Sequence, residues 1–196
     1  WVAQAKLAQP KSAHSFTYLQ ADANELPFED NSFEFVTCQT VLIHMQDPKL
    51  TIAEWMRVLK PGGLLGVVEP NNIAGNLVRS SNDFNDPIEE IMERVAFMMT
   101  CERGKQVLGE GHNSLGDLVP GFFAEKGLKD IQVFISDKGS PCIAPYSDPA
   151  QQAQIEQSRE WASRDFGPWS LDETRRYFVA GGGDVSQFTR LRTHWL

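Results

Sequence analysis

The sequence predicts an α/β fold built on a mostly parallel, Rossmann-like sheet with flanking helices. Residues 33–38 are rich in aromatic and β-branched side chains, residues 47–60 have a helical repeat, and residues 64–68 form a continuous apolar run. The last pattern is typical of a strand that is buried on both faces. A strand, a helix and a strand with short connections form a right-handed crossover between parallel strands. Ligands of such sheets bind beyond the carboxyl ends of the strands.

The helix at residues 47–60 has clear start and stop signals. Asp47 can cap its first turn, and Pro48 stands at the first helical position, where a missing N–H costs nothing. Ile52 and Trp55 recur at helical spacing and form an apolar face. Pro61 and the two glycines after it are expected to end the helix and turn the chain into the next strand.

Length and composition limit the class of protein. The 196 residues suit one domain, and the net charge of −8 argues against nucleic acids or an anionic membrane as partners. No apolar run approaches the roughly 20 residues that cross a bilayer, and no signal-peptide pattern opens the sequence. Cys38, Cys101 and Cys142 are odd in number and lack metal-ligand spacing, which favours reduced thiols in a cytoplasmic protein without a metal site.

Three short motifs give the most specific signal. D-A-x-x-L-P-F occupies residues 22–28, D-x-S-F-E occupies residues 30–34, and L-K-P-G-G occupies residues 59–63. In this order and spacing they resemble the second half of a class I S-adenosylmethionine-dependent methyltransferase, in particular the group that includes the ubiquinone/menaquinone methyltransferases. The resemblance implies that residues 1–9 form a helix and residues 16–20 a strand of the same sheet.

The resemblance also implies a site for the cofactor S-adenosylmethionine. Asp22 and the backbone of Ala23 would hold the adenine, while Gln39, Thr40 and Val41 would lie against the methionine part, largely through backbone groups. Plainer interpretations stand beside these. Asp22 can instead cap the turn that follows it, and the segment after the strand can be an ordinary loop.

Candidate contacts for the methyl acceptor come from residue types. His44 can act as a base or orient a nucleophile, although a lone histidine is more often a hydrogen-bonded loop residue. Glu69 and Asn71 follow the 64–68 strand, where a substrate would enter, and can equally hold the turn. Phe97 and Met98 belong to an apolar helical stripe, which favours core packing first and an apolar substrate pocket second.

The sequence pattern of residues 86–123 predicts two helices. Asp86 is expected to cap the first, whose apolar stripe lies within residues 88–99, and a glycine-containing loop is expected at residues 104–113. Ser114 is expected to cap the second helix. Pro120 marks either a kink in it or its true start.

The remaining segments complete a two-part organisation. Residues 129–136 alternate in polarity and predict a strand. We expect residues 1–75 to be the C-terminal part of the Rossmann-like cofactor-binding core, and residues 76–196 to be a helical cap with the rest of the sheet. Polar helices are expected at residues 149–164, 170–179 and 184–196, with caps at Asp148, at the Ser170–Glu173 capping box and at Asp184.

Two features of the family do not occur in these 196 residues. The glycine-rich loop and the acidic ribose-binding residue both belong before Trp1 in the family's order. The resemblance therefore implies a fold truncated at its N-terminus, and the helical end at Leu196 suggests the same for the C-terminus. A second copy that fills the gap, as a homodimer, is the alternative. We expect the isolated 196 residues to lack useful affinity for S-adenosylmethionine.

The leading functional prediction is methyl transfer from S-adenosylmethionine to a small-molecule acceptor. The sulfonium already activates the methyl group, so the protein mainly positions the acceptor, and no catalytic dyad has to stand out. A non-catalytic, methyltransferase-like interaction module is the main rival, and a glycine-rich loop encoded before Trp1 would favour the enzyme. A nucleotide-dependent oxidoreductase is disfavoured by the motifs at residues 22–28 and 59–63.

Overall fold

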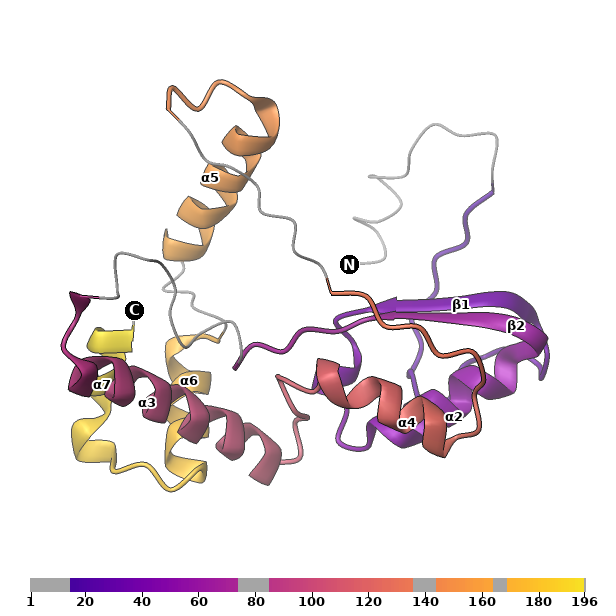
Figure 1. Ribbon diagram of the computed structural model, residues 1–196, viewed down its shortest axis with the longest axis horizontal. Coiled ribbons are helices and arrows are strands. Elements are labelled where there is room, and N and C mark those ends of the chain that lie inside the picture. Colours follow the sequence, from indigo (N-terminus) through magenta and orange to yellow (C-terminus); the bar gives the residue numbers. More distant parts are fainter. Residues whose placement is uncertain (1–14, 74–84, 136–143, 164–168, 196) are drawn as a thin grey trace. The chain divides into compact units, whose positions relative to one another are not determined.

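The computed structural model describes residues 15–73, 85–135, 144–163 and 169–195 (Figure 1). The chain divides into two compact units. The first unit contains the chain up to Cys38 together with Asp47–Val67, and the second contains Gln39–Gln46 and the chain from Val68 onward.

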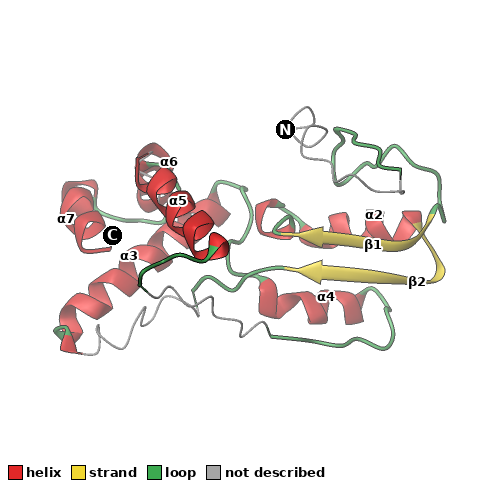
Figure 2. Ribbon diagram, turned by 90° about the horizontal axis from the view of Figure 1, so that it is seen from above, coloured by secondary structure: helices red, strands yellow, loops and turns green. Residues whose placement is uncertain are grey.

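A strand–helix–strand crossover forms the first unit. β1 (Phe33–Gln39) and β2 (Leu59–Val68) are hydrogen-bonded neighbours that run in the same direction, and α2 (Pro48–Val58) connects them (Figure 2). Asp47 caps α2, because its carboxylate accepts two N–H groups of the first turn. The predicted α/β, Rossmann-like fold is confirmed.

β2 is longer and more exposed than predicted. The chain becomes extended directly after Val58, so the helix ends before Pro61 is reached and β2 already starts at Leu59. Leu64 and Val68 expose 66% and 62% of their surface, so the expectation of a strand buried on both faces is wrong. Within the described part of the first unit, α2 is the helix that flanks the strand pair, and both faces of a sheet are buried only when helices cover both.

Two predicted strands do not form. Residues 16–20 and 129–135 are irregular, and Phe16, Leu19 and Phe134 are exposed. A strand needs a partner for its backbone N–H and C=O groups, and the sheet of the described residues consists of β1 and β2 alone. The helix predicted at residues 1–9 lies outside the described residues.

The second unit is mainly helical. The long helix α3 (Ile88–Val107) packs against α6 (Leu171–Ala180) and α7 (Phe188–Trp195), and these helices lie side by side in Figure 1. Tilted and edge-to-face ring contacts within the core they share add to its apolar burial. The core consists of Phe97, Met98, Cys101, Trp169, Tyr177, Phe178 and Phe188.

Gly104 corrects the prediction that the chain leaves the helix at residue 104. It lies inside α3, which continues to Val107. A Cβ on Gly104 would lie 1.7 Å from the backbone oxygen of Tyr177, and one on Gly181 would lie 2.0 Å from that of Thr100. Both glycines are therefore needed for the close approach of α3 and α6, and Gly104 does not break the helix.

Other details of α3 and its successor also differ from prediction. Ile88 and Met92, both in the predicted stripe, are exposed. Asp86 does not cap α3, because its carboxylate pairs with Arg94. Ser114 caps no helix; α4 (Val119–Glu125) follows a 3-10 turn at Gly116–Leu118 and carries a proline in its first turn, as the second interpretation of Pro120 required.

Two of the three later helices begin where their caps predicted, and the third begins after a 3-10 turn. Asp148 accepts two N–H groups at the start of α5 (Pro149–Ser163), and Ser170 and Glu173 form the predicted capping box of α6. Asp184 caps a 3-10 turn at Val185–Gln187 that leads into α7. Within the described residues, no helix is long and apolar enough to cross a membrane.

Candidate functional site

Asp22 shapes a tight turn in the first unit. Its side-chain oxygen Oδ1 accepts the N–H of Asn24 at 2.8 Å, and its backbone oxygen accepts the N–H of Glu25 at 3.2 Å. The turn interpretation is thus present in the structure. These hydrogen bonds leave acceptor sites of Asp22 available to a ligand, because a carboxylate has about four such sites and Asp22 is exposed. The N–H of Ala23, at the centre of this turn, has no acceptor among the described residues.

Side chains of α2 hold this turn in place. The buried hydroxyl of Thr51 donates to the side-chain oxygen of Asn24 at 2.6 Å, and Glu54 accepts the N–H of Leu26 at 2.7 Å. Arg57 in turn donates to both oxygens of Glu54, and these hydrogen bonds lower the pKa of the Glu54 carboxyl to about 2. The segment that presents Asp22 and Ala23 is therefore held by side chains of the crossover helix.

In the second unit, Glu69 organises the loop that follows β1. Its oxygen Oε1 accepts the N–H groups of Val41 and Leu42, each at 2.8 Å, and Oε2 accepts that of Ile43 at 3.4 Å. This carboxylate caps the 3-10 turn at Leu42–His44, where a negative charge is favourable. Glu69 thus holds the turn, as the plainer interpretation of this residue proposed.

The same contacts decide what Gln39, Thr40 and Val41 can offer a ligand. The N–H of Thr40 donates to Val68 at 2.9 Å, and that of Val41 is taken by Glu69. The N–H groups of Thr40 and Val41 are therefore taken within the protein, which leaves carbonyl oxygens for a ligand, and the carbonyl oxygen of Val41 also accepts the N–H of His44. Carbonyl oxygens accept hydrogen bonds from an ammonium group and not from a carboxylate, and the predicted contact of this segment with the methionine part of S-adenosylmethionine stays a prediction.

His44 closes the 3-10 turn, and its backbone N–H donates to Val41. The residue is exposed, yet enough protein surrounds the imidazole for desolvation to lower its pKa. The charge of Lys105 lowers this pKa further, while that of Glu69 opposes the shift. A lowered pKa keeps the ring neutral at pH 7, the form that can accept a proton.

The segment after β2 is tied to the segment after α3. Asn71 donates to the carboxylate of Asp117 at 2.8 Å, and Asn72 donates to the backbone oxygen of Asn113 at 2.6 Å. The side-chain oxygen of Ser114 accepts the N–H of Ile73 at 2.9 Å. Asn71 therefore holds its own segment in place, and its predicted contact with a methyl acceptor stays a prediction.

Phe97 and Met98 lie in the core between α3, α6 and α7, where they expose 1% and 3% of their surface. Their stripe thus packs a core, which was the first of its two interpretations. A place at a substrate pocket stays a prediction. Within the described residues, no group of three or more acidic, histidine or cysteine side chains could hold a metal ion.

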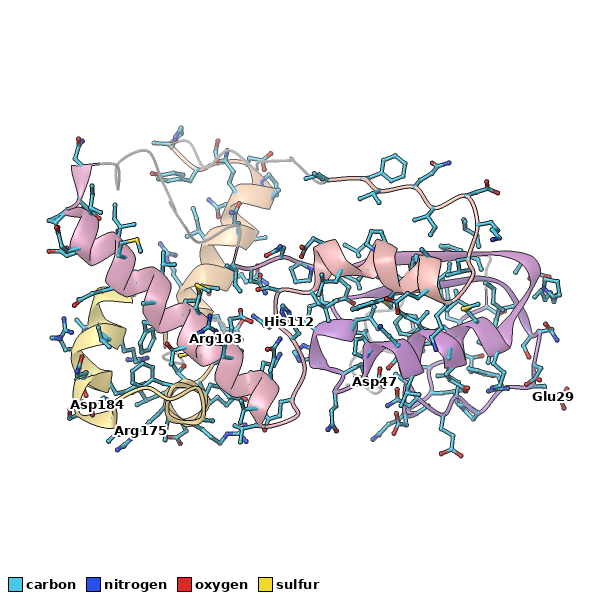
Figure 3. The ribbon with its side chains drawn as sticks, turned by 60° about the horizontal axis from the view of Figure 1, so that its bottom comes forward. Glu29, Asp47, Arg103, His112, Arg175 and Asp184 are labelled. Atoms are coloured by element: carbon cyan, nitrogen blue, oxygen red, sulfur yellow. The ribbon has the colours of Figure 1, made fainter. Side chains whose placement is uncertain are left out.

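Sequence reasoning missed a polar cluster at the end of α3, which we call the α3 cluster: Glu102, Lys105, Asn113 and Ser114. All four residues are buried. A signal was present, because Glu102 lies four residues after Met98 and Lys105 lies four residues after Cys101, so each shares a buried helix face with an apolar residue. His112 stands in the segment between α3 and α4 (Figure 3), and its Nδ1 accepts the N–H of Ser114 at 3.1 Å.

Known proteins resemble part of the chain. Residues 1–67 match a family described as methyltransferase domain. The ubiquinone/menaquinone biosynthesis C-methyltransferase of Saccharophagus degradans is 41% identical over 83 residues, which cover 42% of the chain and 33% of that protein. Its counterpart in Psychromonas ingrahamii is 30% identical over 112 residues, 57% of the chain and 41% of that protein. The demethylmenaquinone methyltransferase of Renibacterium salmoninarum is 48% identical over 52 residues, 26% of the chain and 22% of that protein.

The matched segments thus span less than half the length of these relatives. The family match at residues 1–67 includes the motifs at residues 22–34 and 59–63 from which the resemblance was inferred. The resemblance to class I S-adenosylmethionine-dependent methyltransferases of the ubiquinone/menaquinone type is confirmed over part of the chain, and residues 1–67 are the segment that matches the methyltransferase domain family.

Proposed function

We propose that the chain belongs to a cytoplasmic enzyme that transfers a methyl group from S-adenosylmethionine to a small-molecule acceptor. The methyltransferase domain at residues 1–67 supports the proposal. So do the relatives, whose names describe C-methylation in ubiquinone and menaquinone biosynthesis. The net charge of −8 further favours a small acceptor over a nucleic acid.

The observation that carries the proposal is the pairing of acceptor and donor at Asp22 and Ala23. One carboxylate oxygen of Asp22 holds the turn, which leaves the other for an exocyclic amino group. The N–H of Ala23, which has no acceptor among the described residues, can donate to a ring nitrogen. An adenine edge presents such an amino group beside such a nitrogen. The carbonyl groups of Gln39, Thr40 and Val41 would take the amino group of the methionine part.

Bound S-adenosylmethionine would supply a methyl group that its sulfonium has already activated. The task left to the protein is to orient the acceptor and, where the acceptor must lose a proton, to receive it. His44 suits that second task, because its pKa is lowered and its ring is neutral at pH 7. We propose acceptor contacts for Asn71, Phe97 and Met98 from their residue types and their positions along the chain.

Calorimetric titration of the full-length natural protein with S-adenosylhomocysteine tests the proposal. Asp22→Asn keeps an oxygen for the N–H of Asn24 but places an NH₂ group toward the ligand, so affinity is expected to fall about ten- to hundredfold. Glu29→Gln, the same change at an exposed residue of the same unit, should leave affinity unchanged. Equal affinities of the two folded variants would remove Asp22 from the site, and a natural protein that binds no ligand would favour the interaction module.

A further inference from the structure

The α3 cluster places two ionisable side chains where such groups are rarely found. Glu102 exposes 4% of its surface and Lys105 exposes 2%. Charged residues are almost never fully buried unless their charges are compensated. The proposed chemistry at Asp22, Ala23 and residues 39–44 uses neither of them, so their burial needs a separate explanation.

Lys105 reaches the loop that follows β1. Its ammonium donates to the backbone oxygen of Ile43 at 2.9 Å and to the side-chain oxygen of Asn113 at 3.3 Å. Ile43 lies in the 3-10 turn whose N–H groups are capped by Glu69. A carboxylate thus holds the N–H side of this turn, and a cation holds one of its carbonyl groups. Both charges match the polarity of a helical turn.

Glu102 holds the side chains that accompany Lys105. Its oxygen Oε1 accepts hydrogen bonds from Asn113 and Ser114, each at 3.2 Å. The other oxygen, Oε2, is buried and has no hydrogen-bond partner among the described residues. Burial raises the pKa of Glu102, against the opposing effect of these hydrogen bonds. Buried polar atoms in folded proteins normally have a hydrogen-bond partner, so the α3 cluster differs from an ordinary protein core.

The α3 cluster is joined to the segments after both strands. Ile43 belongs to the loop after β1, and the N–H of Ile73, after β2, donates to Ser114. Gly111 adds a close backbone contact on the same side, since a Cβ there would lie 2.3 Å from the backbone oxygen of Ile43. The end of α3 therefore determines where the loop after β1 can lie within this unit.

We propose that Lys105, kept in place by Glu102 and Asn113, is a positioning residue for the cofactor. By fixing the carbonyl of Ile43 it fixes residues 39–44, the loop that would receive the methionine part of S-adenosylmethionine. The inference rests on the proposed function. It assigns to α3, the long helix of the second unit, an indirect part in binding the cofactor, through the loop that it holds.

The test compares Lys105→Met with Arg103→Met in the full-length natural protein. Methionine keeps much of the lysine volume but cannot donate to Ile43. Arg103 is exposed on the same helix (Figure 3) and has no hydrogen-bond or ion-pair partner among the described residues. Its replacement by methionine removes the same positive charge as Lys105→Met. We expect Lys105→Met to speed amide hydrogen exchange at residues 41–45 about tenfold or more, because a charge-assisted hydrogen bond is lost. Exchange in α6 should stay unchanged, and Arg103→Met should alter neither segment.

Kinetics separate positioning from general damage. Lys105→Met should raise the KM for S-adenosylmethionine about tenfold while kcat at saturation stays within about twofold, and Lys105→Arg, which keeps a charged donor, should recover part of the loss. If Lys105→Met does not fold, Asn113→Leu replaces it and should shift the same measurements less strongly. Unchanged exchange and KM, or lost protection throughout α3 and α6, would overturn the inference. If the natural protein binds no S-adenosylhomocysteine, the proposed function fails, and the exchange data alone decide whether Lys105 fixes the loop.

Discussion

Replacing Gly104 by alanine tests the close contact between α3 and α6. The new Cβ would lie 1.7 Å from the backbone oxygen of Tyr177, where ordinary van der Waals contact starts at 3.4 Å. In an exposed helix interior, alanine stabilises the helix by about 1 kcal/mol relative to glycine. Overpacking costs about 1–3 kcal/mol, and here the obstacle is backbone that cannot rotate away. We expect the cost of overpacking to exceed the gain in helix propensity, so that the free energy of unfolding falls by about 2 kcal/mol and the Tm falls by roughly 4–8 °C.

Urea unfolding followed by circular dichroism measures the difference, and a second glycine supplies the control. Gly121 lies in α4, and a Cβ there would meet nothing within 4 Å. Gly121→Ala should therefore stabilise the protein by about 0.5–1 kcal/mol through backbone entropy. A Gly104→Ala variant that is as stable as the unsubstituted protein, beside a Gly121→Ala variant that behaves as expected, would refute the close approach of the two helices.

Two further predictions concern ionisation. The contact with Arg57 lowers the pKa of Glu54 from 4.5 to about 2, so the contribution of the Glu54 carboxylate to stability is complete above pH 4.5 and is lost as the pH falls toward 2. Glu54→Gln should remove this part of the acid sensitivity, as denaturant titrations at several pH values can show. An unchanged pH profile of the free energy of unfolding would contradict this prediction. Burial raises the pKa of the Cys101 thiol to about 12, so iodoacetamide at pH 8 should label Cys101 only after unfolding, as mass spectrometry of digested protein can show. Rapid labelling in the folded state would show that Cys101 is accessible.

Local signals in the sequence predicted local structure well. The caps at Asp47, Asp148 and Ser170 were correct because a side chain and the N–H groups it accepts lie within three residues of each other. The motifs at residues 22–28, 30–34 and 59–63 likewise predicted the resemblance to methyltransferases, because each motif lies within a few consecutive residues.

Features that depend on distant residues were missed. Residues 104–113 were predicted to be a loop, although Gly104 lies within α3, because its role depends on a close contact with Tyr177, which lies on another helix. Residues 129–135 have the alternation of a strand, but alternation cannot supply a partner. The α3 cluster was overlooked for a related reason: the contact of Lys105 with Ile43 joins positions 62 residues apart.

The capping of residues 41–43 by Glu69 has a consequence for loop grafting. Designers who change the specificity of an enzyme often exchange one active-site loop for that of a relative. The loop after β1 is not a separable module in this protein, because its N–H groups are capped from the end of β2. A grafted sequence would need a carboxylate at position 69 and a backbone that brings three N–H groups to it. Libraries built on this scaffold should therefore vary the two segments together.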